Sequence, residues 1–433
     1  FSGPRNKETQ TPTATRGKPC LLAVGVWVPA TGFTRVLSSI FTRLVDRFDT
    51  HIIGIGYKGP EMMVEGVTIH PCNLKGGDMF GQYQAEEFVR RHRPEIVFLL
   101  NDIWILDKYM PHLAPYQDST RIVCYSPLDG RLLDDTLVAP FSVLAPSSRF
   151  VVYTEFARFE LQQAIVRLAQ AQEGFTFPGV EVVPHGVDTQ TFYPVPGSVE
   201  RQLEPAGRLA AKQLLFPGVP DMEDSFVVLN ANRAQSRKRI DLTLQGFALF
   251  ARDKPRNVRL VLHHAVPYGD ALAQVQRQVE ALGMTHRVKM GPEDESGVTN
   301  EGLNLIYNAC DVGINTSMGE GWGLVSFEHA ATGAAQIVPR HSASAELWAT
   351  SAELVEPVAA YVPDFAMLEM QEVAPEGVAA ALERLYADEA HRRDMSLRAY
   401  RNATRPDYRW EHIAQQWSRL FSDMGAGQPL PTT

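Results

Sequence analysis

The sequence predicts an α/β protein made of two doubly wound, parallel-sheet domains that face each other across a cleft. Three observations lead to this fold class. Short, nearly continuous apolar runs recur along the 433 residues, which suits strands covered on both faces. A turn and an amphipathic helical pattern accompany these runs, and alternating β and α units build parallel sheets. The series then starts again after a connection that contains Pro and Gly, so the chain divides into two similar halves.

The first half opens with the apolar run 21–28 (LLAVGVWV), followed by a turn over 29–32. Apolar residues then recur at helical spacing from Val36 to Phe48. Residues 1–18 are polar and are expected to form a flexible arm outside the fold. Further strands are predicted at 51–56, 95–100, 121–125 and 150–153, with a helix at 84–93.

The second half begins near Ser225 with FVVLNAN, after a connection over 182–194 (VVPHGVDTQTFYP). A helix is predicted at 240–252, and strands at 258–262, 287–290, 311–314 and 335–338. We expect an N-terminal domain over 19–195, a C-terminal domain over 196–404, a helix over 405–424 that crosses back to the first domain, and a flexible tail over 425–433. Ligands of open α/β sheets bind beyond the carboxyl ends of the strands, so binding is expected in the cleft between the two sheets.

Composition and charge exclude several classes of protein. The chain has 41 Lys and Arg against 50 Asp and Glu, a net charge of -9, so no global basic field attracts nucleic acid. No apolar run approaches the roughly 18 residues that a membrane span needs. A cytoplasmic protein is expected, with at most peripheral contact at the inner face of the membrane. The four cysteines are far apart and lack C-x-x-C spacing, which favours free thiols over disulfides or a zinc site.

Segment 317–333 (SMGEGWGLVSFEHAATG) is the most informative stretch of the sequence. Its glycines let the backbone approach a ligand, and the start of the helix that follows directs free amide N–H groups at it, which favours a phosphate. Glu320 lies in the turn and Glu328 in the helix, so they are expected to contact different parts of one extended ligand. Sugar hydroxyls suit both carboxylates, which accept hydrogen bonds from them.

With this segment the sequence resembles glycosyltransferase family 4, the retaining nucleotide-sugar transferases of the GT-B fold. Glu320 and Glu328 match that family's E-x7-E motif. Segment 184–194 is similar to its P-x-G-V-D-x-x-x-F-x-P signature, 232–238 resembles its G-R-L-x-x-x-K segment, and 408–411 is like its closing W-E helix. The resemblance spans roughly 19–420, and its specific part lies in the second domain.

The resemblance implies that Arg233 and Lys238 hold the donor's diphosphate. The residues support this independently, because two cations five positions apart just past a strand can reach adjacent phosphate oxygens. The alternative is a solvated basic helix start, since Arg237 and Arg239 belong to the same charge cluster.

The other donor-side roles also follow from the resemblance. Glu328 would accept hydrogen bonds from the ribose, and Glu320 would contact the transferred sugar, with stabilisation of the helix dipole alone as the alternative. The strand that carries Met290 would hold the base. The backbone cradle for the phosphates would come from Gly321, Gly323, Leu324 and Val325.

The first domain matches the family only in outline. Gly32 fits the family's glycine loop, although many relatives have two adjacent glycines there; a purely structural turn is the alternative. The family's His near the end of strand 121–125 is missing, and Asp129 is expected to take part of its role on the sugar or acceptor side, with Asn101 and Asp102 as rivals. His185 is expected to make a hinge hydrogen bond. The pair at 263 and 264 is expected to be packed or exposed rather than to contact the base or sugar.

The implied reaction is transfer of a sugar from a nucleotide diphosphate sugar, a UDP-sugar in preference to a GDP-sugar, to an acceptor hydroxyl with retention of configuration. Basic groups would stabilise the charge on the departing diphosphate, so no metal and no cofactor beyond the nucleotide sugar is expected. A non-catalytic sugar-nucleotide binder, a nucleotide-sugar epimerase and a phosphorylase are the alternatives on this fold. Sugar, lipid-linked, protein and small-molecule acceptors all stay open.

Overall fold

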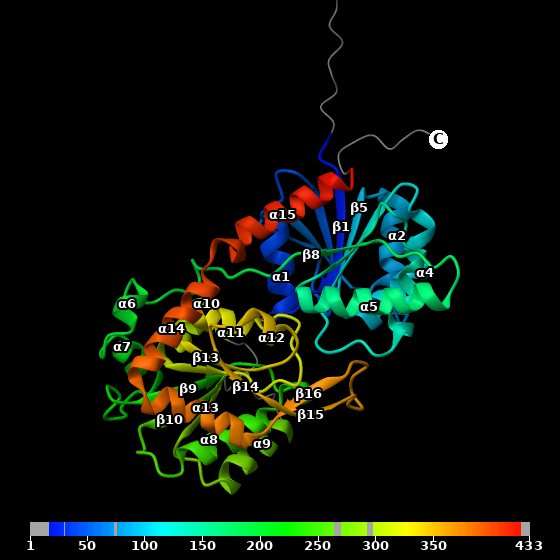
Figure 1. The fold of residues 1–433 in the computed structure, drawn as a ribbon. Coiled ribbons are helices and arrows are strands. Elements are labelled where there is room, and N and C mark those ends of the chain that lie inside the picture. Colours follow the sequence, from blue (N-terminus) through cyan, green and yellow to red (C-terminus); the bar gives the residue numbers. More distant parts are fainter. Residues whose placement is uncertain (1–16, 30, 73–75, 264–269, 292–297, 426–433) are drawn as a thin grey trace, which may run out of the picture.

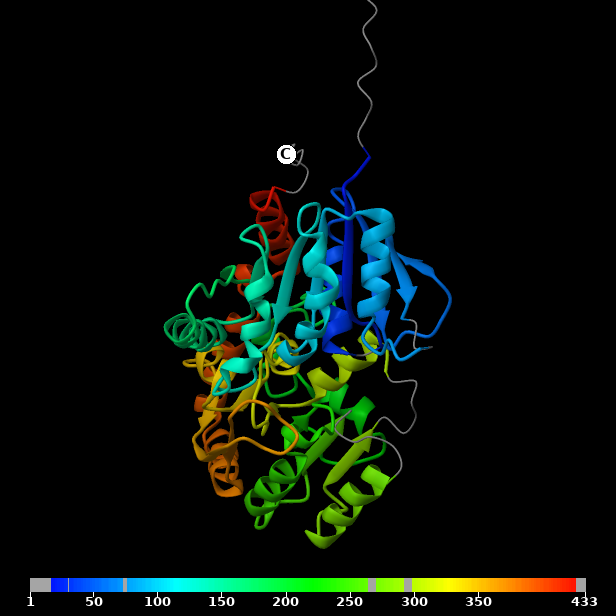
Figure 2. The ribbon, with the colours of Figure 1, turned by 90° about the vertical axis from the view of Figure 1, so that its right-hand side faces the viewer.

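The computed structural model describes residues 17–29, 31–72, 76–263, 270–291 and 298–425. The arm predicted at 1–18 and the tail predicted at 425–433 fall almost wholly outside these residues. The described chain forms two α/β halves, each built around its own sheet, and Figures 1 and 2 show them stacked one above the other. The predicted fold class, with two mainly parallel sheets, is confirmed.

An eight-stranded sheet in the order β3-β4-β2-β1-β5-β6-β7-β8 forms the first half. All neighbouring strands are parallel except the antiparallel pair β3 and β4 at one edge. The strands are β1 (Cys20–Val26), β2 (Asp49–Ile55), β3 (Met62–Val64), β4 (Val67–Pro71), β5 (Ile96–Leu100), β6 (Arg121–Ser126), β7 (Arg149–Val152) and β8 (Gly179–Val182). The helices are α1 (Gly32–Phe41), α2 (Gln82–His92), α3 (Ile103–Leu106), α4 (Met110–Leu113) and α5 (Glu155–Ala171).

The second half contains a six-stranded parallel sheet in the order β11-β10-β9-β12-β13-β14. Its strands are β9 (Phe226–Asn230), β10 (Val258–His263), β11 (Val288–Gly291), β12 (Val312–Ile314), β13 (Ala335–Pro339) and β14 (Glu353–Val355). Its helices are α6 (Val199–Gln202), α7 (Leu209–Leu215), α8 (Ile240–Ala251), α9 (Asp270–Ala281), α10 (Asn300–Ala309), α11 (Leu324–Ala330), α12 (Ser342–Leu347), α13 (Pro375–Ala387) and α14 (Glu389–Ala403). Short 3-10 helices occur in both halves. Those of the first half are Asp107–Tyr109, Ala114–Tyr116, Asp135–Leu137 and Ala139–Val143, and two more lie at Ser236–Lys238 and Pro406–Tyr408.

The last helix, α15 (Trp410–Asp423), returns from the second half and packs on the first, as the sequence predicts. Its apolar face meets the first sheet: the Trp417 ring lies 4.9 Å from that of Phe98, and Phe421 lies 5.6 Å from Phe48 between ring centroids. One hydrophobic core therefore runs through both halves, because side chains of α1, α11 and α15 belong to the same buried cluster.

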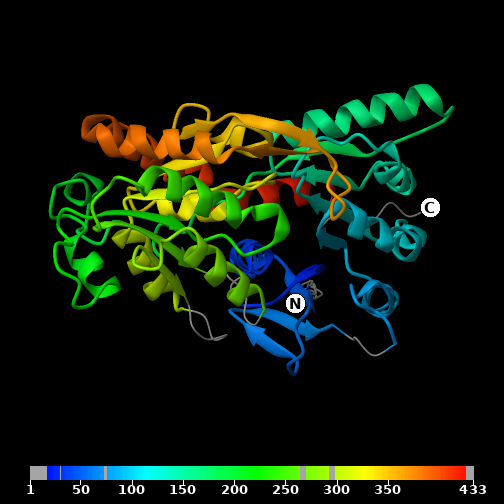
Figure 3. The ribbon, with the colours of Figure 1, turned by 90° about the horizontal axis from the view of Figure 1, so that it is seen from below.

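A two-stranded hairpin of β15 (Pro357–Tyr361) and β16 (Met370–Val373) joins the halves at a second place. Arg131 N–H donates to Glu369 O at 2.9 Å, and Glu369 N–H donates back to Arg131 O at 3.0 Å. The Leu368 side chain is 1% exposed and lies in the core of the first half. Figure 3 shows the orange hairpin reaching toward the cyan segment of the first half.

Several predicted boundaries are wrong, each for a local reason. β1 ends at Val26 rather than residue 28, because Val28 N–H donates to Thr34 Oγ1 at the start of α1. The helical spacing up to Phe48 is not one helix: α1 ends at Phe41, and turns with bonds such as Leu44 N–H to Phe41 O continue the pattern. Strands β3, β4, β8, β14, β15 and β16 were not predicted from the sequence.

Candidate functional site

Two glycines of segment 317–333, Gly319 and Gly321, allow the two halves to approach each other closely. A Cβ at Gly319 would lie 2.1 Å from Asp129 O, and one at Gly321 would lie 2.5 Å from Pro127 Cβ. Gly323 has φ of 89°, a left-handed conformation that favours glycine. Gly321, expected to approach a ligand, lies close to Pro127 and to the carboxylate of Asp129, the expected sugar-side residue of the first half.

Glu320 lies at the centre of a buried charge cluster. Its side chain accepts hydrogen bonds from Lys238 Nζ and, at 2.9 Å, from Asn315 Nδ2. Arg237 Nη1 lies 3.6 Å from the other carboxylate oxygen. Burial raises the pKa of Glu320, but Lys238 and Arg237 outweigh burial and bring this pKa down to about 2. Glu320 is therefore an ionised hydrogen-bond acceptor at neutral pH and not an acid.

Arg237, which the sequence analysis treated only as part of a charge cluster, links the halves. Its guanidinium donates to Gly319 O at 2.7 Å and lies 3.5 Å from the Asp129 carboxylate of the first half. Burial raises the pKa of Asp129, and Arg237 partly opposes this rise. Asp102, at the start of α3, has a pKa raised to about 7 by burial and by Asp129. The structure thus brings together two of the three expected acceptor-side residues with the Glu320 cluster.

Glu328 is engaged by the opposite half. Arg35, on α1, forms an ion pair with Glu328, and Tyr307 Oη donates to the second carboxylate oxygen at 3.3 Å. Glu328 is 3% exposed, and the Arg35 guanidinium carbon lies 5.2 Å from the centre of the Phe192 ring. No sequence motif pointed to Arg35, because its partner lies 293 positions away.

The remaining donor-side candidates lie in different surroundings. Arg233 is exposed in the loop after β9, whereas Lys238 is buried. Gly32 faces the start of α11: a Cβ there would lie 3.4 Å from Leu324 Cδ1. Leu324 and Val325 form the first turn of α11 and are half-buried, and Met290 is half-buried in β11.

Two other candidates of the first half and hinge are packed inside the protein. Asn101 is 6% exposed, and its side-chain oxygen accepts the Asp102 N–H at 2.9 Å. The hinge hydrogen bond predicted for His185 is wrong: neither ring nitrogen has a partner within the described chain. His185 instead packs against Tyr153, with ring centroids 4.0 Å apart, and burial lowers its pKa to about 3. His263 is buried, and residue 264 lies outside the described residues.

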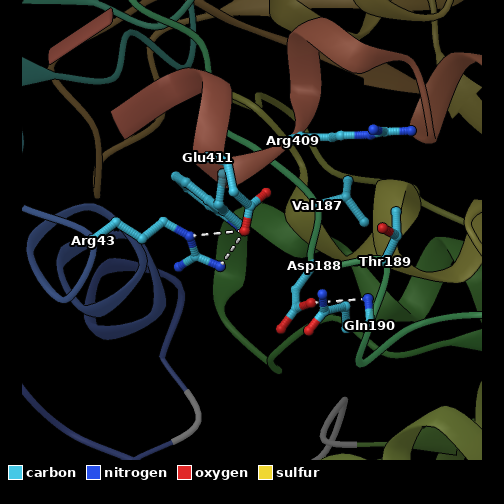
Figure 4. A pocket seen from close by; sticks show the side chains of 8 residues that line it. Arg43, Val187, Asp188, Thr189, Gln190, Arg409 and Glu411 are labelled. Atoms are coloured by element: carbon cyan, nitrogen blue, oxygen red, sulfur yellow. Dashed lines mark hydrogen bonds and ion pairs between the residues drawn. The ribbon is translucent and has the colours of Figure 1, made fainter. Parts of the chain in front are cut away.

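A pocket of about 300 Å³ lies beside the connection between the halves (Figure 4). Its ion pair joins Arg43 to Glu411 at 3.0 Å. The lining residues are Arg43, Val187, Asp188, Thr189, Gln190, Arg409, Trp410 and Glu411. Because none of these residues belongs to the Glu320 cluster, the pocket is separate from the candidate site.

The described residues contain no group of three or more His, Cys, Asp or Glu side chains placed to hold a metal ion. All four cysteines, Cys20, Cys72, Cys124 and Cys310, are free thiols. Within the same residues, no helix is long and apolar enough to cross a membrane.

No protein-family model matches the chain. Among curated proteins, the D-inositol 3-phosphate glycosyltransferase of Kineococcus radiotolerans is 34% identical over 232 residues, which cover 52% of this chain and 47% of that protein. The mannosylfructose-phosphate synthase of Agrobacterium fabrum is 27% identical over 170 residues, covering 37% and 33% respectively. The chain spans less than half the length of these curated relatives.

Solved structures match over nearly the whole chain. Sucrose-phosphate synthase from Thermosynechococcus elongatus superposes with a TM-score of 0.70 at 16% identity, covering 95% of this chain and all of the other. A glycosyltransferase from Rickettsia africae gives 0.69 at 13% identity and covers 95% of this chain and 100% of its own. The Anabaena protein HepE in complex with UDP and glucose gives 0.65 at 16%, covering 94% and 100%. The chain therefore has the fold of the GT-B glycosyltransferases.

Proposed function

We propose that the chain is a retaining, metal-independent glycosyltransferase that moves a sugar from a UDP-sugar to an acceptor hydroxyl. The main support for this proposal is the buried cluster of Glu320, Lys238 and Arg237 on a GT-B fold. Arg237 of this cluster also pairs with Asp129 of the opposite half. The proposal assigns the donor to 196–404 and the acceptor to 19–195. Two solved structures of similar fold contain UDP-glucose, or UDP and glucose, which supports a UDP-sugar as the donor.

In the proposed reaction the bond between the sugar and the diphosphate breaks, and negative charge develops on the departing phosphate oxygen. Lys238 and Arg233 would stabilise that charge, which is the role that a divalent cation has in other transferases. Lys238 already has Glu320 as its partner, so its ammonium is held in place before the donor arrives. Oriented charge of this kind needs no reorganisation during the reaction.

Glu320 would accept hydrogen bonds from hydroxyls of the transferred sugar. Its low pKa suits this role, because an ionised carboxylate accepts hydrogen bonds and does not deliver a proton. The acceptor hydroxyl would attack from the face that the diphosphate leaves, and a phosphate oxygen of the donor would take its proton. This route retains the configuration and needs no second carboxylate as base, unlike a glycosidase.

Release of nucleoside diphosphate from a panel of UDP- and GDP-sugars tests the proposal. We expect turnover with a UDP-sugar, and a loss of at least about a hundredfold for Lys238→Ala and for Glu320→Gln. Lys254→Ala and Glu383→Gln are matched controls, because these two residues form an ion pair with each other outside the Glu320 cluster.

The alternatives give different results in the same assay. Donor binding without turnover would make the chain a sugar-nucleotide binding protein, and interconversion of the sugar without its transfer would make it an epimerase. Wild-type rates in both cluster variants would show that the chemistry lies elsewhere.

A further inference from the structure

Three polar side chains follow three neighbouring strands of the first sheet. β5, β6 and β7 are adjacent and parallel, so their carboxyl ends lie at the same edge. Asp102 comes two positions after β5, Asp129 three positions after β6, and Tyr153 directly after β7. This edge faces the second half, since Asp129 lies 3.5 Å from Arg237. We call Asp102 and Asp129 the acidic pair, and Tyr153 its tyrosine.

The tyrosine hydroxyl has no hydrogen-bond partner within the described chain, although Tyr153 is only 3% exposed. Burial raises the pKa of Tyr153, and Tyr125 and then the Asp102 and Asp129 carboxyls add to this rise. Burying a hydroxyl without a partner is unfavourable by an amount comparable to a lost hydrogen bond. A ligand group that reaches both this hydroxyl and the carboxyls would remove that penalty.

The cations beside the acidic pair are already engaged by carboxylates. Asp102, Asp129 and Glu320 supply three carboxyls, and Arg237 and Lys238 supply two cations. Lys238 is bonded to Glu320, and Arg237 is shared between Glu320, Asp129 and Gly319 O. Among the described residues no ion pair forms at Asp102, and its pKa is raised to about 7 by burial first and then by Asp129. Neither of these two cations is therefore left over to neutralise a phosphate at the acidic pair.

We propose that the acidic pair and its tyrosine bind hydroxyl groups of an acceptor that carries no phosphate at this end, an uncharged sugar or polyol. A hydroxyl is both donor and acceptor, so it accepts from Tyr153 Oη while it donates to Asp102 or Asp129. A dianionic phosphate cannot donate to a carboxylate, and both nearby cations, Arg237 and Lys238, already have carboxylate partners. This inference rests on the proposed glycosyltransferase function. It also separates this chain from relatives whose names contain a phosphorylated acceptor or product.

The test compares three acceptors, glucose, fructose and myo-inositol, each with its monophosphate, using UDP-glucose as donor. We expect at least a tenfold higher kcat/KM for the uncharged member of any pair that reacts. Tyr153→Phe should raise the acceptor KM about tenfold and leave the Kd for UDP-glucose unchanged. Asp102→Asn should narrow the preference for the uncharged acceptor in assays at pH 8, because at that pH most of the Asp102 carboxyl is ionised and the substitution removes its charge.

Tyr125→Phe is the matched control. Tyr125 is also a buried tyrosine, its ring lies 4.5 Å from that of Tyr153, and its hydroxyl donates to Val183 O at 2.7 Å. Tyr125→Phe should lower the melting temperature without changing acceptor preference. Tyr153→Phe should keep or raise the melting temperature, because the hydroxyl removed has no partner in the free chain.

Each contrary result has a definite meaning. A phosphorylated acceptor that reacts as well as its uncharged partner, or an unchanged acceptor KM in Tyr153→Phe, overturns the subsite. A Tyr153→Phe variant that loses UDP-glucose affinity instead places the hydroxyl on the transferred sugar and also overturns it. Binding of UDP-glucose without transfer to any uncharged acceptor also overturns the subsite. Failure to bind any UDP-sugar is distinguishable, because it refutes the proposed function itself.

Discussion

Arg35 on α1 forms an ion pair with Glu328 on α11, across the boundary between the two halves. Glu328 is buried, and Tyr307 Oη donates to its other oxygen at 3.3 Å, so this carboxylate has a partner on each side in the free chain. Glu328 is also the residue expected to accept hydrogen bonds from the donor's ribose. A ribose bound there would share or replace Arg35, and donor binding would then be coupled to the contact between the halves.

Breaking this pair from one side should destabilise the protein more than breaking it from both. Arg35→Met leaves the Glu328 charge buried without its cation, and because Arg35 is itself 27% exposed we expect a loss of about 2 kcal/mol in the free energy of unfolding. Arg35→Met with Glu328→Gln should recover at least half of that loss. Urea unfolding of the two single variants and the double variant gives the coupling energy. Additive losses would mean that Arg35 contributes only packing.

Stability should fall as the pH falls below about 6.5. Burial lowers the pKa of His185 and His329 to about 3 and that of His341 to about 4, whereas the ordinary value is 6.5. Between these values the unfolded chain binds more protons than the folded one, so acid favours unfolding. Denaturant unfolding at pH 7.5, 6 and 5 measures the slope. His185→Phe should make the slope shallower, and an unchanged slope would show that His185 is protonated while folded.

Asp102 should have the opposite pH dependence. Its pKa is raised from 3.8 to about 7 in the folded chain, so the folded state binds the extra proton, and this residue's contribution to stability falls as pH rises from about 4 to about 7. Asp102→Asn should remove that fall and gain stability relative to wild type between pH 5 and pH 8. No capping bond is lost, because the Asp102 side chain makes none at the start of α3. A constant difference across this range would contradict the raised pKa.

The hairpin contact between the halves makes a prediction from two adjacent residues. Leu368 is 1% exposed in the core of the first half, whereas Met367 is 48% exposed. Leu368→Ala should lower the free energy of unfolding by about 2–5 kcal/mol, the range for large-to-small changes in a core. Met367→Ala should change it by less than about 0.5 kcal/mol. Equal effects of the two substitutions, measured by urea unfolding, would mean that the hairpin does not insert into the first half.

The central strands could be predicted from sequence, and the edges of the structure could not. β5, β6, β9 and β13 are buried along their whole length, and β5, β6 and β9 each contain a run of four or five apolar residues. β3 and β8 contain half-buried and exposed positions, and each has only three or four residues, so their pattern is too weak to distinguish a strand from a loop.

The site divides in the same way. Glu320 and Lys238 could be linked because both lie in segments that resemble motifs of one family, and the structure joins them. The contacts of Arg35 and Arg237 could not be predicted from sequence. Each arginine pairs with a carboxylate of the other half, and no local sequence pattern indicates such a distant partner. Tyr153 was not predicted as a site residue, because a tyrosine at the end of an apolar strand is typical of a residue of the hydrophobic core. Its lack of a hydrogen-bond partner is visible only in three dimensions.

NMR spectra recorded during turnover of UDP-α-glucose are the decisive measurement, because they report both the proposed reaction and its stereochemistry. We predict that the first glucosyl product has the α configuration, and that Lys238→Ala forms it at least about a hundredfold more slowly. A product that first appears in the β configuration would contradict the retaining mechanism. An α product that forms at the wild-type rate in Lys238→Ala would contradict the role of the Glu320 cluster.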